Sequence, residues 1–546
     1  MTKIINSAMS GLLAAQAALN NTSNNISNYT VSGYSRRTLQ LAEANTTLNG
    51  NAYYGNGVTI TGVQREYDAF IMSQLRDTSA AYNAANTQHS QISRIDDLLS
   101  RTAGNLSSSL QNFFVNVQNV VSNAGDPAAR QSLLSNAHSL VNQFQVTGQY
   151  LSGLQDNVNA DITAHVNQIN TLTSQVANLN VQISKLSTAG GAKPNNLLDQ
   201  RDQLVNTLNN LIGVKVSQQD GQYNVSTVSG LSLINGNSVT SLVAMPSESD
   251  PSRISVGYVD KQAGKVLIPE SQLGTGSLGG LLNFRNQDLD LAQNKLGQLA
   301  AAFTTRFNTV HKQGFDRKGN PGSDFFTIGN PTTQGNIKNT SSATLTATWN
   351  DSGALKASNY TVSYDGNKWT AIRASDNAKI SLVPVTSDGK TAFNLDGLTL
   401  TVSGKPDARD SFLVKPLQNV VSRMSVAITN ESQIAAAGAK GGESDNRNAQ
   451  KLLAIQDARF VNGNSTLSQA YAGMVSETGN KTRSLETSAK TEKNVLTQLI
   501  NRQQSVSGVN LDEEYANLTR YQQYYMANAQ VLKTASSLFD ALLSIR

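Results

Sequence analysis

The chain has 546 residues, of which 38% are hydrophobic, 6% aromatic and 15% charged, and its formal net charge is +5. Because a single hydrophobic core stops growing at about 250–300 residues, this length predicts more than one domain. The dilute positive charge does not predict a binder of nucleic acid or of a membrane, and the absence of cysteine excludes disulfides, cysteine-ligated zinc and thiol catalysis.

Both ends of the chain predict long helices. The ten prolines all lie between Pro127 and Pro416, and proline breaks helix interiors. The first helix, interrupted by polar residues between Met9 and Leu19, is amphipathic and does not predict a cleaved signal peptide. We therefore expect a protein that is cytoplasmic or is exported without a cleaved signal.

Apolar residues recur at a seven-residue step in both terminal segments. They are Ile5, Leu12, Leu19 and Ile26 near the start, and Leu511, Leu518, Tyr525, Leu532 and Phe539 near the end. Such a repeat keeps an apolar seam along one side of a helix and favours coiled-coil packing. One amphipathic helix packed within its own domain gives the same pattern, but matched seams at both ends favour assembly between helices. We expect these nine residues to form a subunit interface.

The middle of the chain alternates between helical and strand patterns. Apolar residues step by three or four from Ile162 to Leu186, which predicts a helix. Alternation with turn signals predicts strands over 214–274, a helix returns from Leu281 to His311, and further strands follow to Pro416. Turns are expected at Asp365–Gly366, Asp388–Gly389 and Asp396–Gly397. Helices are expected again from Leu417 to Arg546, with breaks at 438–442 and 463.

These patterns, taken together with the resemblance described below, predict an elongated α+β multidomain protein with terminal coiled-coil-forming helices, a helical-bundle middle layer and inserted β-rich domains. The expected divisions are axial terminal helices at 1–70 and 505–546, with an extended segment at 29–66; a helical domain at 71–213, 275–312 and 417–504; a β-rich subdomain at 214–274; and an outer β-rich domain at 313–416.

The sequence contains no convincing motif for a catalytic, nucleotide-binding or metal-binding site. Gly274–Gly279 matches a dinucleotide fingerprint, but a helix follows where a strand with an acidic residue is needed, so we expect a flexible joint. The four histidines are far apart, and Asp512, Glu513 and Glu514 stand in the first turn of a helix, where they stabilise its dipole. We therefore expect no enzyme, no catalytic residue, no cofactor and no metal.

Motifs at the two ends carry a resemblance. The run from Ser23 to Asn28, followed by Gly33 and Tyr34, resembles the N-terminal signature of bacterial flagellar rod, hook and hook-associated proteins, and the run from Ser507 to Glu514 is similar to their C-terminal helix motif. Ser27 stands where many relatives carry alanine. The motif residues are Ser23, Asn24, Asn25, Ile26, Asn28, Gly33, Tyr34, Gly508, Asn510 and Leu511.

Within that family, the segment Asn195–Asp202 and the helix from Leu299 to Gly314 resemble the hook-associated members at the first hook–filament junction. A hook or rod protein is the alternative, but the long helical region after Leu417 argues against it. A second alternative is an adhesin with a β-domain on a helical stalk. It needs an exposed aromatic platform, for which Trp349 and Trp369 are the candidates.

The resemblance implies export through the flagellar type III channel and a secreted, extracellular location at the hook–filament junction. The terminal helices would pack as coiled coils around a central channel, in a ring of copies of the chain. The implied partners are the chain itself, the flagellar hook protein below, hook-associated protein 3 above, and an export chaperone on the C-terminal helix. Neither nucleic acid nor a membrane is an expected partner.

Overall fold

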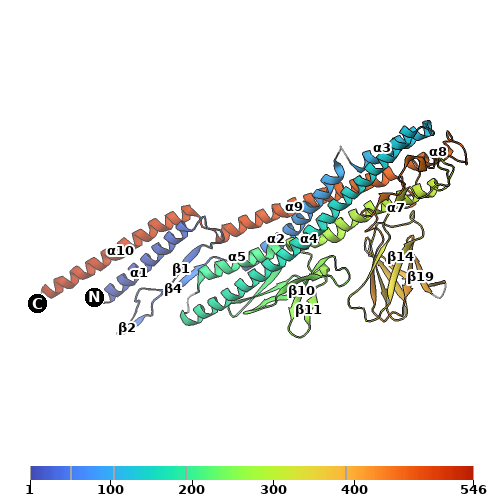
Figure 1. Cartoon of the computed structure of the whole chain (residues 1–546). Helices are drawn as coiled ribbons and strands as arrows, with labels where there is room; N and C mark the ends of the chain where they lie inside the picture. The colour runs from blue at the N-terminus through green and yellow to red at the C-terminus, as the bar shows by residue number, and fades with distance from the viewer. Residues whose placement is uncertain (1, 50–51, 102–104, 191–192, 388–389, 545–546) are drawn as a thin grey trace.

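The computed structural model describes residues 2–49, 52–101, 105–190, 193–387 and 390–544. The molecule is long and narrow, with the two terminal helices at one end, a rod of long helices, and β-rich parts along one side of that rod (Figure 1). The expected elongated α+β multidomain fold is confirmed.

The terminal helices α1 (Thr2–Ser27) and α10 (Leu511–Ser544) lie side by side and antiparallel; we call them the axial pair (Figure 1). Small residues form the buried face of α1, among them Ala8, Ala15 and Ala18. At Gly11 the approach is closest, because an added Cβ would lie 2.5 Å from Oδ1 of Asn528 on α10. Small residues therefore let the two backbones come together.

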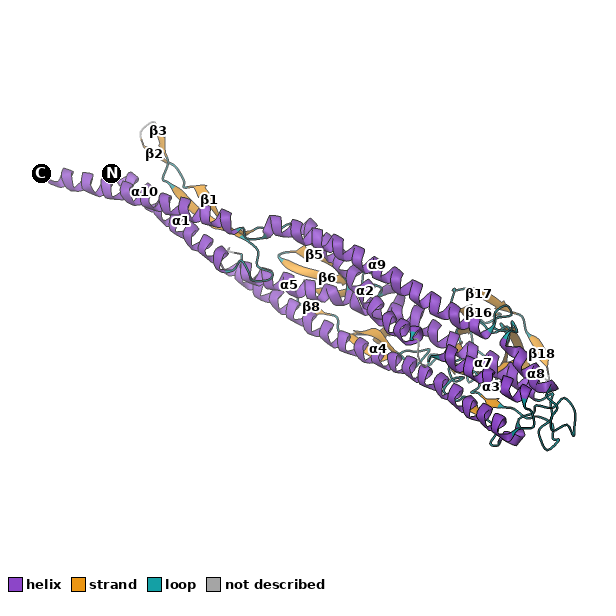
Figure 2. Ribbon diagram, turned by 90° about the horizontal axis from the view of Figure 1, so that it is seen from above, coloured by secondary structure: helices purple, strands orange, loops and turns teal. Residues whose placement is uncertain are grey.

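A β-ribbon follows α1 in the chain. Strands β1 (Arg37–Glu43) and β4 (Val58–Arg65) pair antiparallel, and β2 (Thr47–Asn49) pairs with β3 (Ala52–Tyr54). This ribbon runs beside the axial pair and its tip projects from the molecule (Figure 2). It occupies the segment that the sequence predicted to be extended.

Long helices form what we call the helical body. They are α2 (Ala69–Ser100), α3 (Leu106–Ser122), α4 (Pro127–Gly190), α5 (Asn195–Ile212), α6 (Gly276–Asn283), the π-helix η2 (Phe284–Leu289), α7 (Asp290–His311), α8 (Arg447–Leu453) and α9 (Leu467–Ser507), with short 3₁₀ helices η1 (Glu270–Gln272), η3 (Glu431–Gln433) and η4 (Ala454–Gln456). The predicted stripe from Ile162 to Ile183 is mostly buried on α4, whereas Leu186 is exposed.

Two small sheets, which we call the β-subdomain, lie along α4 (Figure 1). Their orders are β5-β6-β7-β8 and β11-β10-β9. The strands are β5 (Val214–Gln219), β6 (Gln222–Thr227), β7 (Ser232–Asn235), β8 (Ser238–Val239), β9 (Leu242–Pro246), β10 (Ile254–Asp260) and β11 (Gly264–Leu267). Asparagines of α4 bind this backbone: Asn170 exchanges two hydrogen bonds of 2.8 Å with Leu242.

A five-stranded sheet (β13-β21-β15-β16-β17) and a four-stranded sheet (β14-β20-β19-β18) make up what we call the outer sandwich. The strands are β13 (Thr332–Gly335), β14 (Thr344–Trp349), β15 (Tyr360–Tyr364), β16 (Trp369–Arg373), β17 (Lys379–Leu382), β18 (Val385–Ser387), β19 (Lys390–Leu395), β20 (Leu398–Ser403) and β21 (Ser411–Lys415). At the expected turns, Gly366 and Gly397 have φ of +100° and +81°; the expected turn at Asp388–Gly389 lies outside the described residues.

Trp369 lies in the core of the outer sandwich, with its ring 5.7 Å from that of Phe393 and 6.0 Å from that of Phe412. Trp349 is half-buried beside the same core. Because Trp369 is buried, it cannot be part of an exposed aromatic platform, and the adhesin alternative loses one of its two candidates.

The helix predicted from Leu417 is wrong for residues 417–446, which are irregular except for η3 and the short strand β22 (Ser425–Val426), paired with β12 (Phe326–Thr327). Parts of the segment are buried, among them Val420, Met424 and residues 434–437, and helix side chains satisfy three of its carbonyl groups. Arg130 donates to the oxygen of Ile434 (2.8 Å), Gln145 to that of Met424 (2.9 Å) and Asn448 to that of Ala435 (2.7 Å). Such long-range partners leave no periodic signal in the sequence.

The first part of the predicted outer domain packs with the helical body. Phe325 and Phe326 are fully buried, and their rings lie 5.0 Å and 5.5 Å from that of Phe307. Phe326 also lies 5.2 Å from Phe303. The separable part of the outer domain therefore begins beyond these two phenylalanines rather than at residue 313.

His311 is a buried structural residue at the end of α7. Its Nδ1 lies 2.7 Å from the oxygen of Ser323, and its Nε2 accepts a hydrogen bond of 2.9 Å from the backbone N–H of Ala435. This arrangement holds the neutral ring, with its proton on Nδ1. Burial lowers the pKa of His311 to about 4.

Acid should destabilise the protein through His311. Its unfolded pKa is about 6.5, so between that pH and about 4 the unfolded chain binds a proton that the folded chain does not, and stability falls as pH falls. From pH 7 to pH 5 the loss is about 2 kcal/mol. We expect His311→Gln to be less stable at pH 7 but to lose less on acidification. Denaturant unfolding of both proteins at the two pH values measures this; equal losses would contradict the assignment.

Candidate functional site at the base of the axial pair

Asn25 lies where the axial pair meets the ribbon, and it is 1% exposed. Its Nδ2 donates to the backbone oxygen of Arg37 (2.9 Å) and to Oε2 of Glu514 (3.2 Å). Its Oδ1 accepts from the hydroxyl of Tyr34 (2.8 Å) and from the N–H of Arg37 (3.1 Å). An amide has two donors and can accept twice, so every polar position of Asn25 is used. Aspartate, which has no donor when ionised, cannot replace it.

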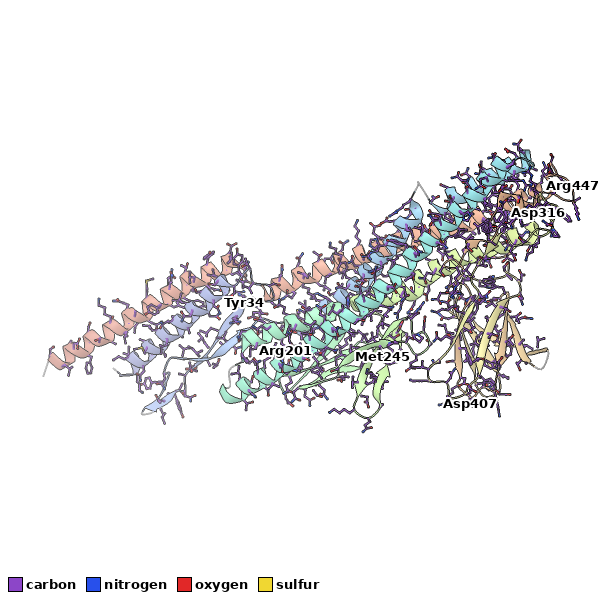
Figure 3. All side chains as sticks on the ribbon, viewed as in Figure 1. Tyr34, Arg201, Met245, Asp316, Asp407 and Arg447 are labelled. Carbon is purple, nitrogen blue, oxygen red and sulfur yellow. The ribbon has the colours of Figure 1, made fainter. Side chains whose placement is uncertain are left out.

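Glu514 on α10 is also 1% exposed and joins the two ends of the chain. Its Oε1 lies 2.8 Å from Nε of Arg36, while Nη1 of Arg36 lies 2.7 Å from the exposed Glu513. Burial opposes the charge on Arg36, but pairing with Glu514 and Glu513 outweighs burial and raises the pKa of the guanidinium. We call Asn25, Tyr34, Arg36 and Glu514 the joint (Figure 3).

Sequence reasoning assigned Glu514 to the helix dipole and did not identify Arg36. Glu514 does stand in the first turn of α10 with Asp512 and Glu513. Its ion pair, however, spans 478 positions of the chain. No local pattern links residues so far apart. The sequence held one signal for the buried position of Glu514: unlike Asp512 and Glu513, it lies on the same face of α10 as Tyr521, Asn528 and Ala535, at a seven-residue step.

A second group of charges fastens the ribbon to the helical body. Nη1 of Arg65 lies 3.0 Å from Asp199 and 2.6 Å from Asp202, both on α5. The hydroxyl of Tyr223 on β6 donates to Asp202 at 2.6 Å. Burial opposes the charge on Arg65, but pairing with Asp202 and Asp199 raises its pKa. The ribbon that follows the joint in the chain is thus tied to α5 by ion pairs.

The other motif residues shape the turns around the joint. Gly33 has φ of +83°, a conformation that favours glycine. Gly508 follows α9, where an added Cβ would lie 2.4 Å from the oxygen of Gln504. Asn510 caps α10 by accepting from the N–H of Asp512 (3.0 Å). Ser23 and Asn24 are exposed, and Asn28 donates to the backbone oxygen of Asn24 (2.8 Å).

The nine seam residues divide into two sets. Ile5, Leu12, Leu19 and Ile26 are half-buried, and at 3.6 residues per turn they lie about a quarter turn from the buried small-residue face of α1. Leu511, Leu518 and Leu532 are half-buried on the side of α10 that carries the buried Glu514 and Ala535, whereas Tyr525 is 36% and Phe539 48% exposed. The interface role of all nine stays a prediction.

Large apolar side chains remain exposed on the axial pair. On α1 they are Ile4, Met9 and Leu13, and on α10 they are Tyr515, Tyr524, Tyr525, Met526, Val531, Leu538, Phe539 and Leu543. The α10 set is distributed around the helix rather than along one stripe. Exposed apolar surface of this extent on one helix is typical of surfaces that other elements or chains cover.

The Gly274–Gly279 turn does enter a helix, and two of its glycines, Gly276 and Gly279, lie close against backbone atoms. An added Cβ at Gly276 would lie 2.6 Å from the backbone of Leu211, and one at Gly279 would lie 2.3 Å from the carbonyl carbon of Gly274. Within the described ranges, no cluster of three acidic or histidine side chains is arranged to hold a metal ion. None of the helices described is both long and apolar enough to cross a membrane.

Three family models match parts of the chain. Residues 92–326 match the family model of the helical domain of flagellar hook-associated protein FlgK, and residues 334–416 match the D2-like domain of flagellar hook-associated protein 1. Residues 502–545 match the C-terminal model of the flagellar basal body rod proteins FlgE, FlgF and FlgG.

Complete relatives show the same relationship. The chain is 52% identical over 550 residues to flagellar hook-associated protein 1 of Escherichia coli strain K12, and 51% identical over 556 residues to that of Salmonella typhimurium, covering 100% of each chain. Its fold is similar to that of the flagellar hook junction protein FlgK from Burkholderia pseudomallei, with a TM-score of 0.76 and 29% identity over 80% of this chain and 100% of the other.

Proposed function

The chain belongs to the flagellar hook-associated protein 1 family, the structural proteins of the hook–filament junction, and from that premise we propose how it assembles. The axial pairs of several copies pack together in a ring at the hook tip. The observation that carries this is the distribution of exposed apolar residues around α10, which contacts α1 on only one side. Neighbouring copies would cover the remaining sides.

The half-buried residues of α1 are placed to join such an interface. Ile5, Leu12, Leu19 and Ile26 flank the α10 contact, so a helix from the next copy can pack against them without separating α1 from α10. Tyr525 and Phe539 are exposed in the single chain and would become buried in the ring. Leu511, Leu518 and Leu532 would contact both α1 of the same chain and helices of neighbouring copies.

The layers of the molecule suit a radial arrangement. The axial pair would line the centre, the helical body would form the next layer, and the β-subdomain and outer sandwich would face outward (Figure 1). The flagellar hook protein would lie on one side of the ring and hook-associated protein 3 on the other. An export chaperone would hold the apolar α10 before secretion through the type III channel.

Assembly in a strain that lacks this protein tests the proposal. Cross-links between introduced cysteine pairs can be assigned without ambiguity, because the chain has no cysteine of its own. We expect Met9→Cys with Phe539→Cys to yield cross-linked ladders of this chain in isolated hook–filament structures. Lys261→Cys with Lys379→Cys, at exposed positions in the turn between β10 and β11 and on β17, should not. A ladder absent from the first pair in assembled filaments would contradict the axial interface.

Removal of the outer sandwich should leave assembly largely intact. We expect a chain without residues 331–416, closed by a short linker, to remain folded, to be exported and to support filament growth, because the axial pair is untouched. A deletion that begins at residue 314 also removes Phe325 and Phe326. Each such buried ring contributes about 3–5 kcal/mol, so that protein should be far less stable. Thermal unfolding and swimming measure the two effects; a folded 331–416 deletion that blocks filament growth would contradict this.

A further inference from the structure

Three parts of the molecule meet at the loop 247–253 of the β-subdomain. Asp250 in this loop is 5% exposed. Its Oδ2 lies 2.5 Å from Nζ of Lys415, the last residue of β21 in the outer sandwich, and 3.0 Å from Nε of Arg253. Nη1 of Arg253 in turn lies 3.0 Å from Oδ2 of Asp290, the first residue of α7 in the helical body. One chain of ion pairs therefore joins the three parts. Glu248 in the same loop adds two contacts with the sandwich: its carboxylate lies 2.6 Å from Nζ of Lys338, and its backbone oxygen accepts from the N–H of Ile337 (3.0 Å).

Pairing outweighs burial at Asp250 but not at Lys415, whose pKa is lowered by burial in spite of its pairing with Asp250. Burial opposes ionisation of Asp250, but pairing with Lys415 and Arg253 lowers the pKa of its carboxyl. Lys415 and Arg253 are themselves mostly buried. A buried ion pair adds little stability compared with apolar packing, but it fixes the geometry of the groups that it joins.

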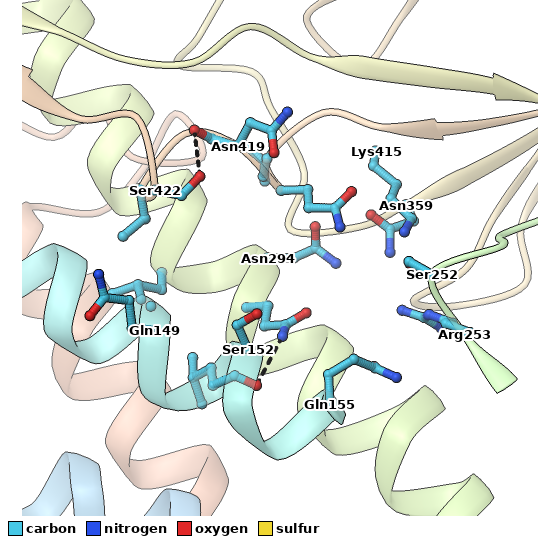
Figure 4. Close-up of a pocket in the computed structure, with 17 residues that line it drawn as sticks. Gln149, Ser152, Gln155, Ser252, Arg253, Asn294, Asn359, Lys415, Asn419 and Ser422 are labelled. Carbon is cyan, nitrogen blue, oxygen red and sulfur yellow. Dashed lines mark hydrogen bonds between the residues drawn. The ribbon is translucent and has the colours of Figure 1, made fainter. Parts of the chain in front are cut away.

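Cavities lie on both sides of the ion pairs. One of about 260 Å³ is lined by polar side chains of α4, α7 and the sandwich, with Asn294, Asn359 and Lys415 around it (Figure 4). Another of about 520 Å³ separates the β-subdomain from the sandwich, and Ile268 and Ile372 line it. The two β-rich parts, which lie on the same side of the rod (Figure 3), are thus separated by open volume rather than by a packed apolar core.

The outer sandwich has a second and different attachment. Leu355, in its loop after β14, is buried, and Gln298 on α7 donates to the oxygen of Leu355. Lys356 donates to Oδ1 of Asn462 at 2.8 Å. Two chain crossings, before β13 and after β21, complete the connection to the helical body. We call the packed contact at Leu355 the pivot. We call the ion pairs beside the cavity, at Lys415 and Asp250, the latch.

We propose that the chain Lys415–Asp250–Arg253–Asp290 is a latch that sets the angle of the outer sandwich, and that opening it lets the sandwich turn about the Leu355 contact without unfolding. Small, polar contacts between domains permit relative motion, whereas packed cores do not. The open volume beside Ile372 gives the sandwich room to move.

Spin-label distances test this proposal on the full chain. Lys261→Cys in the β-subdomain and Lys379→Cys in the sandwich provide two exposed label positions in a protein without native cysteine. We expect one narrow distance distribution in the labelled parent. Lys415→Met should at least double its width, and Asp290→Asn, at the other end of the chain of ion pairs, should do the same.

Matched variants separate the latch from general effects of charge. Lys415→Arg keeps the cation and should retain the narrow distribution. Lys215→Met breaks an exposed pair with Asp77 elsewhere (2.6 Å) and should also leave it unchanged. If the melting transition shows that Lys415→Met unfolds the sandwich, the width of the distance distribution in the Asp290→Asn protein tests the proposal instead. A parent-like width in a folded Lys415→Met or in Asp290→Asn would overturn the proposal.

Discussion

Aspartate in place of Leu532 is expected to abolish attachment to the hook while leaving the helical body and the β-rich parts folded. Leu532 is half-buried on the α10 face toward α1, and we propose that neighbouring copies cover the rest of it. Burying a leucine contributes about 1.5–3 kcal/mol, and burying an unpaired carboxylate costs several more. The loss is repeated at every subunit of a ring, so we expect motility to fall to the level of a strain without the protein.

Gln523 provides the matched control for this prediction. It is exposed on the same helix, and Gln523→Asp adds the same charge without removing an apolar side chain. Electron microscopy of hooks, with circular dichroism of the purified proteins, measures attachment and folding separately. Normal filaments seeded by the Leu532→Asp protein would show that this position is not at a subunit contact.

The sequence predicted well those features that repeat locally. The helical stripe of α4 from Ile162, the long terminal helices and the turns at Gly366 and Gly397 all follow from spacing between near neighbours. The seam predicted on α10 lies partly against α1 of the same chain, and its role as a subunit interface stays a prediction. Periodicity identifies a buried face but does not say which helix covers it.

Features that depend on distant partners were not predicted. Instead of the predicted helix, residues 417–446 follow an irregular and partly buried path, in which Arg130, Gln145 and Asn448 bind backbone oxygens. At the candidate site, the resemblance identified Asn25 and Tyr34, but Arg36 and the buried role of Glu514 became visible only when the two ends of the chain were brought together. Polar pairs between residues far apart in the chain produce no regular spacing in the sequence from which they could be predicted.

The joint should be the most sensitive polar site in the protein, and Glu514→Ala tests it. Removing this carboxylate leaves the half-buried Arg36 with only the exposed Glu513, and leaves Nδ2 of Asn25 with only the oxygen of Arg37. Breaking a buried pair by removing one partner costs about 3–5 kcal/mol. We expect α10 to detach from α1 at its first turn, so that proteases cleave the axial pair much faster and filament growth is lost.

Glu513→Gln is the control for Glu514→Ala, because it removes the exposed carboxylate that contacts the same guanidinium. An exposed ion pair is worth about 0–1 kcal/mol, so this protein should assemble normally. Asn25→Ala should resemble Glu514→Ala, and the double variant should lose less than the sum of the two, since they share one hydrogen-bonded network. Strictly additive losses, or wild-type proteolysis of the Glu514→Ala protein, would mean that the two ends of the chain are held together elsewhere along α1 and α10 rather than at this joint.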